Sequence, residues 1–156
     1  MIITATEADG PRIQSIAARA GVFSQEEVDA VSVMWMEYLA LGAEESGYHF
    51  IVYRAEDQTL GFAIYGPRDL TDGVFDLYWI AVDPMARCSG IGRKLLNTCE
   101  DAARESGGRM LIAETSGMPL YDSTRKFYFA MGYENEACIR DFYTIGDDLL
   151  IFTKRI

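Results

Sequence analysis

A glycine-rich loop from Arg87 to Gly92, with the sequence RCSGIG, is the part of this chain best suited to chemistry. It follows an apolar stretch at 78–82 and an Asp-Pro turn, and it opens into an amphipathic stretch from Ile91 to about Ser106. A loop at the start of a helix leaves backbone N–H groups unpaired, and the positive end of the helix dipole lies there as well. The loop therefore predicts a site that holds a phosphate or diphosphate through its main chain.

Basic side chains gather around this loop although the chain as a whole is acidic. Its 156 residues include 24 acidic and 14 basic side chains, which gives a formal net charge of −10. Arg87, Arg93 and Lys94 flank the loop, and Arg125 and Lys126 lie in a later predicted helix, so an anionic ligand would meet a local positive field. The overall charge argues against nucleic acid or an anionic membrane as a partner and suits a cationic or zwitterionic one.

The spacing of the glycines excludes two common phosphate-binding motifs. A dinucleotide fingerprint of the form G-x-G-x-x-G would need a glycine where the chain has Leu95. A Walker loop ends in G-K-[ST], whereas Gly92 is followed by Arg93 and Lys94. Glycines at a helix start can also serve only to form a tight turn, so the loop by itself leaves a purely structural role open.

Length and composition predict one globular domain over residues 1–156, with 49% hydrophobic residues and no apolar run near the roughly 20 residues that span a bilayer. The first residues lack the basic and apolar segments of a secretory signal. Cys88, Cys99 and Cys138 have no metal-type spacing and are odd in number, which favours a reducing compartment, the cytoplasm. His49 is the only histidine, so we expect no histidine-rich metal site and no metal cofactor.

The elements that position the loop follow from hydrophobic periodicity and turn residues. Strands are predicted at 1–7, 48–55, 60–65, 74–82, 109–115, 133–142 and 147–154. Helices are predicted at 8–20, 24–41, 91–106 and 121–131, the second of them opened by a capping box at Ser24 and Glu27. The unit 74–115 should form a parallel crossover and the hairpin around 56–58 an antiparallel pair, so the sheet is mixed.

Three segments then carry a resemblance to a known family. The run WIAVDP from Trp79, the pattern R-x-x-G-x-G from Arg87 and the pattern F-Y-x-x-x-G-Y from Phe127 resemble, in order and spacing, the GNAT superfamily of acetyl-CoA-dependent N-acyltransferases. The resemblance covers roughly 74–133, more than a third of the chain. It implies the α/β acyl-CoA N-acyltransferase (GNAT) fold, a twisted and mostly antiparallel mixed sheet of about seven strands flanked by about four helices. That sheet would splay between its fourth and fifth strands to admit the pantetheine arm of CoA.

The resemblance assigns the glycine loop a ligand, the diphosphate of acetyl-CoA. It also implies that the main chain of Ile80 and Val82 pairs with the pantetheine amides, and that an N–H there holds the thioester oxygen as charge develops. Many relatives carry an asparagine seven residues before the helix tyrosine; here Tyr121 stands there, so that contact is either absent or supplied by Ser123 or Thr124. The cofactor-binding residues predicted in this way are Ile80, Ala81, Val82, Arg87, Cys88, Ser89, Gly90, Ile91, Gly92, Arg93, Lys94, Ser123 and Arg125.

Two proton transfers need side chains, one to take a proton from the substrate ammonium and one to protonate the leaving thiolate. Tyr128 lies four residues before Gly132, the position at which the family places its general acid; the alternative is that its ring merely packs in the core. Glu114, at the end of a predicted strand, is the candidate base acting through water, and the alternative is a solvent-facing carboxylate. We expect Cys88 to be incidental, since it lies in the phosphate loop and not near the thioester.

Trp35, Asp76 and Tyr78 are the predicted acceptor contacts. The stripe that contains Trp35 is more often typical of a core-facing helix than of a ligand contact, and the direction of Asp76 and Tyr78 depends on where their strand bulges. The closing segment 140–148 places aromatic and acidic residues near a turn, where they could contact an acceptor amine or a second subunit. A hydrogen-bonded turn explains that segment equally well.

The sequence thus predicts an N-acetyltransferase that moves an acetyl group from acetyl-CoA to a primary amine by direct attack in a ternary complex. A small metabolite or an amino acid is the favoured acceptor, and a protein N-terminus or lysine is the alternative. A noncatalytic acyl-CoA-binding module is the alternative of another class. Pairing of the closing strands could produce a homodimer, while the identity of the acceptor, the acyl chain length and the oligomeric state stay open.

Overall fold

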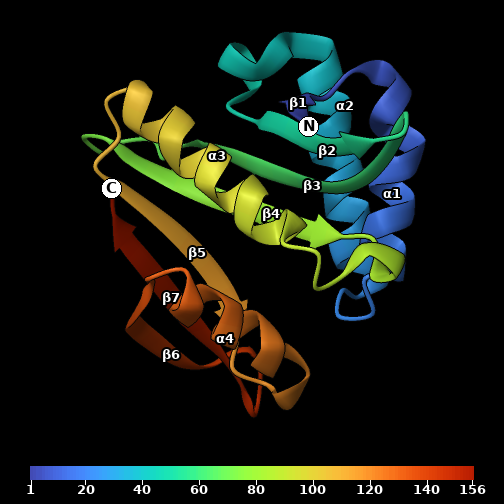
Figure 1. The fold of residues 1–156 in the computed structure, drawn as a ribbon. Helices are drawn as coiled ribbons and strands as arrows, with labels where there is room; N and C mark the ends of the chain where they lie inside the picture. Colours follow the sequence, from blue (N-terminus) through green and yellow to red (C-terminus); the bar gives the residue numbers. More distant parts are fainter.

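The computed structural model describes residues 1–156 and has the order of helices and strands that the sequence predicts (Figure 1). The strands are β1 (Ile2–Thr4), β2 (His49–Ala55), β3 (Gln58–Pro67), β4 (Val74–Val82), β5 (Met110–Ser116), β6 (Glu134–Thr144) and β7 (Asp147–Arg155). The helices are α1 (Gly10–Arg19), α2 (Gln25–Ser46), α3 (Ile91–Glu105) and α4 (Asp122–Ala130), with short 3-10 turns η1 (Glu7–Asp9), η2 (Pro84–Ala86) and η3 (Pro119–Tyr121).

The second helix begins where its capping box predicts but ends later. The Ser24 side chain accepts a hydrogen bond from the Glu27 N–H, and the Glu27 carboxylate accepts one from the Ser24 N–H. The predicted end near residue 41 is wrong, because helical structure resumes after Gly42, which has a left-handed φ of 79°, and continues to Ser46. No helix of the chain, α2 included, has the length and apolar composition that a membrane crossing demands.

All seven strands lie in one sheet in the order β1-β2-β3-β4-β5-β7-β6. Every neighbouring pair is antiparallel except β4 and β5, which run parallel because α3 connects them as a crossover. The mixed, mostly antiparallel sheet with four helices confirms the fold that the motifs implied.

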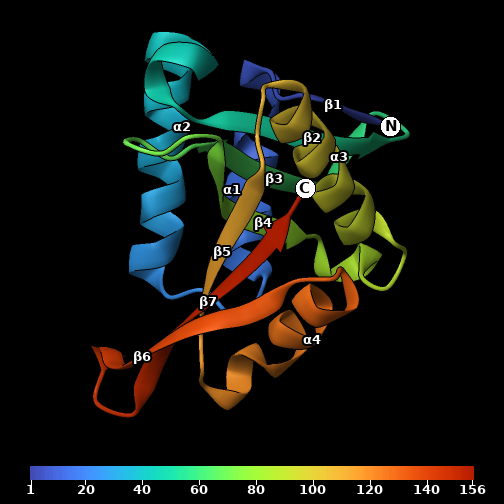
Figure 2. The same cartoon turned by 90° about the vertical axis from the view of Figure 1, so that its left-hand side faces the viewer.

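The parallel pair separates part-way along its length. β4 pairs with β5 only from Val74 opposite Met110 to Leu77 opposite Ala113. Beyond these residues β4 continues to Val82 and β5 to Ser116, but the two strands no longer pair with each other and diverge (Figure 2). The splay expected between the fourth and fifth strands is therefore present.

Two hydrophobic cores lie on the two faces of the sheet. Helices α1 and α2 cover one face, whose fully buried side chains include Ile13, Val31, Phe50, Phe62 and Ile64. Helices α3 and α4 cover the other, whose core includes Leu95, Leu96, Leu111, Tyr128 and Phe152. Each fully buried side chain of this kind contributes about 1.5–3 kcal/mol, so both helical layers are firmly attached to the sheet.

The start of α3 lies close to the sheet because β3 has a glycine there. A Cβ at Gly61 would lie 3.0 Å from the Ile91 side chain and 3.2 Å from that of Leu95, so any larger residue would require these two side chains to shift. This close approach brings the first turn of α3, with its glycine loop, next to the end of β4.

Candidate active site

A cavity of about 800 Å³ lies where β4 and β5 diverge. Its walls come from β4, β5, the loop before α3, α4, the segment between α1 and α2, and the turn between β6 and β7. The predicted site residues in this wall are Tyr78, Ile80, Ala81, Val82, Arg87, Cys88, Gly90, Ile91, Gly92, Arg93, Glu114, Ser123 and Tyr128. The fold thus brings the glycine loop and both predicted proton-transfer residues to one cavity.

The glycine loop has the geometry of an anion site. Gly90 adopts a left-handed conformation, φ 79°, directly before α3, and Cys88 is left-handed as well, φ 61°. The Lys94 N–H makes the first helical hydrogen bond, 3.1 Å to the Gly90 carbonyl, while the N–H groups from Gly90 to Arg93 have no acceptor within the protein. Open main-chain donors at a helix N-terminus are the groups that bind phosphates.

The exposed edge of β4 supplies a second set of open main-chain groups. The Asp83 N–H donates to the Leu60 carbonyl at 2.8 Å, and hydrogen-bonded pairs alternate along antiparallel strands. Ala81 therefore bonds to β3 as well, whereas the main-chain groups of Ile80 and Val82 point away from β3, into the gap that β5 has left. These are the two residues that the resemblance assigned to the pantetheine amides.

The family assignment now rests on independent comparisons. The sequence model described as an acetyltransferase (GNAT) domain matches residues 46–135 of the chain. The structure of an acetyltransferase of the GNAT family from Desulfovibrio desulfuricans is similar with a TM-score of 0.95 at 38% identity, over 99% of this chain and 98% of that one. The chain belongs to the GNAT acetyltransferase family.

More distant GNAT structures share the fold. The ribosomal-protein-alanine N-acetyltransferase of Brucella melitensis is 25% identical, with a TM-score of 0.77 over 100% of this chain and 99% of its own. An acetyltransferase of Salmonella typhimurium, solved with its cofactor acetyl-CoA, is 20% identical, with a TM-score of 0.76 over 99% and 92% of the two chains. No curated protein sequence matches the chain.

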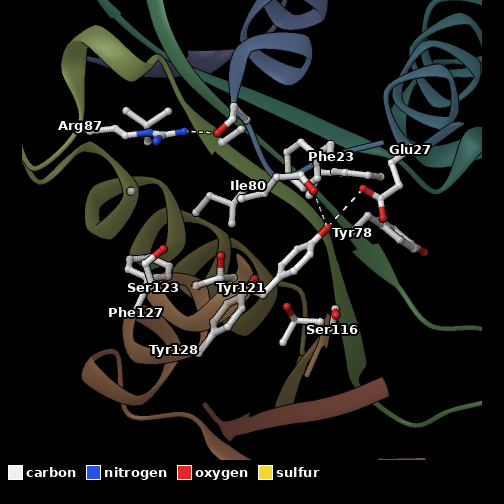
Figure 3. A pocket seen from close by; sticks show the side chains of 18 of the residues that line it. Phe23, Glu27, Tyr78, Ile80, Arg87, Ser116, Tyr121, Ser123, Phe127 and Tyr128 are labelled. Atoms are coloured by element: carbon white, nitrogen blue, oxygen red, sulfur yellow. Dashed lines mark hydrogen bonds between the residues drawn. The ribbon is translucent and has the colours of Figure 1, made fainter. Parts of the chain in front are cut away.

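A buried carboxylate at the end of β4 anchors the segment that leads into the glycine loop. Asp83 is 3% exposed and accepts hydrogen bonds from the Met85 N–H at 2.9 Å and from Arg12 and Arg19 at 2.7 Å each. These bonds lower the pKa of Asp83, the backbone N–H contributing most. Arg87 links the glycine loop to the end of α1, because its guanidinium donates a hydrogen bond to the Ala20 carbonyl (Figure 3).

Replacing Asp83 with alanine should cost roughly 3 kcal/mol of unfolding free energy, because both arginines lose their buried partner. Since the pKa of Asp83 lies below its ordinary value of 3.8, the contribution is complete at neutral pH and is lost as the pH falls below that value. Urea unfolding at neutral pH measures the change. Asp101→Ala removes an exposed ion pair with Arg104 and should cost less than about 1 kcal/mol; equal losses for both variants would contradict the role of Asp83.

Several predicted contacts lie outside the GNAT cavity. Trp35 is buried in the α1–α2 core, its ring centroid 5.0 Å from that of Phe50, so the packing alternative describes it. The Lys94 ammonium lies over the Tyr53 ring, 5.4 Å from the centroid, and so points toward β2. The Ser89 hydroxyl donates to the carbonyl at residue 86 and caps the turn before α3.

The side chains of Arg125 and Asp76 also bond to other parts of the protein and do not line the cavity. The Arg125 guanidinium donates to the carbonyls of Ser116 and Met118 at 2.8 Å and so fixes the segment between β5 and α4. Asp76 is buried beside the cavity and binds Arg68 through both carboxylate oxygens, at 3.0 and 3.1 Å. Arg68 also reaches Glu114, 3.4 Å away, so the two carboxylates share one guanidinium.

A β-bulge decides which way β4 presents its side chains. Trp79 pairs with Ile64 and Leu77 with Tyr65, which leaves Tyr78 as the extra residue. Tyr78 and Trp79 therefore both pack on the α1–α2 face, whereas Leu77 and Ile80 pack on the α3 face. Tyr78 reaches the cavity for this reason.

Tyr128 combines core packing with an accessible position. Its residue is 5% exposed, and its ring lies between those of Tyr133 and Phe152, with centroids 5.5 and 5.6 Å away. The side chain lines the cavity, and its hydroxyl has no hydrogen-bond partner in the protein. Burial raises the pKa of Tyr128, so the hydroxyl carries its proton at neutral pH. The ring packs, as the structural alternative holds, but the hydroxyl is left for a ligand.

Sequence reasoning missed the part that Tyr121 plays. Its hydroxyl donates to the Val22 carbonyl at 2.8 Å and lies 3.3 Å from a Glu27 carboxylate oxygen (Figure 3). The side chain thus crosses the cavity from η3 to the segment between α1 and α2. The only signal in the sequence was an aromatic residue where many relatives have asparagine.

Tyr121→Phe should loosen this link. Losing the hydrogen bond to the Val22 carbonyl should cost about 1 kcal/mol of stability, and the effect should be confined to the contact between η3 and the segment that joins α1 to α2. Amide hydrogen exchange at 22–27 should become faster, while exchange in α3 stays at the wild-type rate. Unchanged exchange at 22–27 would show that the hydroxyl does not hold the two sides together.

Proposed function

We propose that this GNAT acetyltransferase moves an acetyl group from acetyl-CoA to a primary amine by direct attack in a ternary complex. One observation carries the proposal. A single cavity contains the open N–H donors of the α3 loop, the open edge of β4, the unpartnered hydroxyl of Tyr128 and the carboxylate of Glu114.

The residues present fit the cofactor. The N–H groups from Gly90 to Arg93 would hold its diphosphate, with the Arg93 guanidinium adding charge at the same end of the cavity. Ile80 and Val82 would bond the pantetheine amides, since their main-chain groups face the gap. When bound, acetyl-CoA supplies an acetyl group activated as a thioester.

The proposed transfer conserves atoms and protons. The substrate ammonium loses one proton, its nitrogen forms a C–N bond to the acetyl carbon, and the C–S bond breaks. The sulfur takes one proton, and the second proton on the nitrogen is released, so the products are an N-acetyl amine, CoA thiol and one proton. Holding both reactants side by side replaces the need for a covalent enzyme intermediate.

Tyr128 would protonate the departing sulfur, because its hydroxyl faces the cavity, keeps its proton and has no competing partner within the protein. Glu114 would receive the proton of the ammonium through water. The Arg68 guanidinium lies 3.4 Å from the Glu114 carboxylate, whose side chain stays 43% exposed, which leaves room for that water.

The cysteines support direct transfer. Cys88 lies in the glycine loop, Cys99 is a buried residue of α3, and Cys138 is exposed on β6. Only Cys88 lines the cavity, at the end that would hold the diphosphate. No thiol is therefore placed to take the acetyl group.

A small amine is favoured over a protein N-terminus as acceptor. The Brucella melitensis neighbour is named for acetylation of a ribosomal protein, so a peptide acceptor is the second candidate. An extended peptide would have to pass the crossing formed by Tyr121 and Val22, whereas a compact amine fits the cavity without disturbing it.

The test follows CoA thiol release with acetyl-CoA and a panel of small amines, amino acids and an alanine-led peptide, with calorimetry of acetyl-CoA binding alongside. We expect binding and release with at least one amine. Binding without release for any acceptor would favour the noncatalytic module, and absence of binding would contradict the proposal as a whole.

A further inference from the structure

The cavity has a negative end as well as a positive one. Arg87 and Arg93 lie beside the glycine loop. At the other end three carboxylates from separate elements line the wall, Glu27 on α2, Glu114 on β5 and Asp147 on β7. No lysine or arginine lines that end of the cavity.

Two of these carboxylates have no cation of their own. Glu27 accepts hydrogen bonds from the Ser24 N–H and Tyr121, and Asp147 accepts one from the Ser116 hydroxyl. Neither forms an ion pair anywhere in the chain. Partly buried carboxylates without a counter-charge attract a cation from outside the protein.

Tyr143 in β6 lines the same cavity as the three carboxylates. Burial first, and then the negative charges of Glu114, Asp147 and Glu27, raise the pKa of its hydroxyl. All three charges are therefore close enough to Tyr143 to act on it. A ligand next to its ring would meet the same field.

An independent observation shows that the cavity wall is built for a polar ligand. Thr115 lines the cavity and is 5% exposed, and its hydroxyl is the one buried side-chain oxygen or nitrogen in the chain that has no hydrogen-bond partner. Leaving a buried hydroxyl unpaired is unfavourable, so such a group points to a partner that arrives with the ligand. Thr115 follows Glu114 directly and lies on the face of β5 that packs toward Tyr128.

We propose that the acceptor carries a second positive charge, as in a compact diamine, and that Glu27 and Asp147 bind this second charge while Glu114 receives the reacting amine. The inference rests on the proposed function and narrows its substrate class. An amino acid with a free carboxylate is disfavoured, because its negative charge would lie among three carboxylates, and the one guanidinium near them, that of Arg68, is already shared by Glu114 and Asp76.

The test compares diaminoalkanes of three to six carbons with monoamines of the same length. We expect the kcat/KM of the best diamine to exceed that of its monoamine at least about tenfold, a difference that shrinks as salt is added. Calorimetry of the same amines with the CoA-bound protein should show the same preference in affinity. Equal kcat/KM and equal affinity for diamine and monoamine, or a preference for amino acids over amines, would overturn the inference.

Two variants localise the effect. Glu27→Gln keeps the acceptor for the Ser24 N–H, and Asp147→Asn keeps the acceptor for Ser116, so both should fold. Each should bring the ratio of diamine to monoamine kcat/KM down toward one. Glu26→Gln removes the same charge from an exposed neighbour on α2 and should leave that ratio unchanged; a ratio that falls equally in all three variants would contradict the assignment.

The two proposals can fail separately. If acetyl-CoA binds but no amine is acetylated, the proposed function is wrong, and the calorimetric preference for the diamine still decides whether this end of the cavity binds a dication. If amines are acetylated without any preference for a second charge, the proposed function stands and the inference alone is wrong.

Discussion

Replacing Tyr128 with phenylalanine should lower kcat about 100-fold, at the lower end of what a positioned proton donor contributes. The KM for acetyl-CoA should stay within about twofold of the wild type, since the hydroxyl bonds to nothing that shapes the phosphate loop. Steady-state kinetics with a saturating amine measure both. The ring keeps its packing against Tyr133 and Phe152, so the variant should be as stable as the parent protein.

A neighbouring tyrosine provides the matched control. The Tyr133 hydroxyl donates to the buried carboxylate of Glu100 at 3.0 Å and does not line the cavity. Tyr133→Phe should therefore cost stability, roughly 1–3 kcal/mol, and leave kcat near the wild-type value. An unchanged kcat in Tyr128→Phe, or an equal loss of kcat in both variants, would refute Tyr128 as the proton donor.

Gly92→Leu should abolish most cofactor affinity without unfolding the protein. A Cβ at this position would lie 3.5 Å from Phe127 on α4 and 3.8 Å from Val82 on β4, and both residues line the cavity. The rest of a leucine side chain would fill the passage between them, and overfilling of this kind costs about 1–3 kcal/mol, or roughly tenfold to a hundredfold in Kd. Calorimetry with acetyl-CoA measures the change.

Asn97→Leu is the control on the same helix. Asn97 is exposed on α3, so the same side chain is added outside the cavity. Leucine is a better helix former than glycine or asparagine, and both variants should keep or slightly raise the melting temperature. Wild-type affinity in Gly92→Leu would show that the cofactor does not pass between Val82 and Phe127.

Local sequence signals predicted the elements well where one residue controls the backbone. The capping box at Ser24 and Glu27 marked the start of α2, because its hydrogen bonds lie within one turn. The predicted end of α2 was wrong, since Gly42 is the only residue with a non-helical conformation and the helix continues after it to Ser46. The glycine loop before α3 was recognised because its open N–H groups follow from being the start of a helix.

Side-chain directions needed the tertiary structure. The aromatic stripe of α2 was compatible with the core or the acceptor, and only the packing of Trp35 against Phe50 on β2 placed it in the core. Lys94 and Arg125 are long and flexible, so their charge could be read from the sequence but their partners could not. A single extra residue at Tyr78 reversed the alternation of β4, and sequence periodicity does not fix the place of a bulge.

Local patterns were enough to predict the order of elements, the family and the glycine loop before α3, because each of these signals comes from residues within a few positions of one another. The carboxylate-lined end of the cavity could be found only in the folded chain. Glu27, Glu114 and Asp147 are far apart in the chain. They line one cavity because β5, with its neighbour β7, diverges from β4, and the start of α2 borders the resulting space. The partial burial of these carboxylates and the lack of a counter-charge beside Glu27 and Asp147 result from that assembly, so no local sequence pattern predicts them.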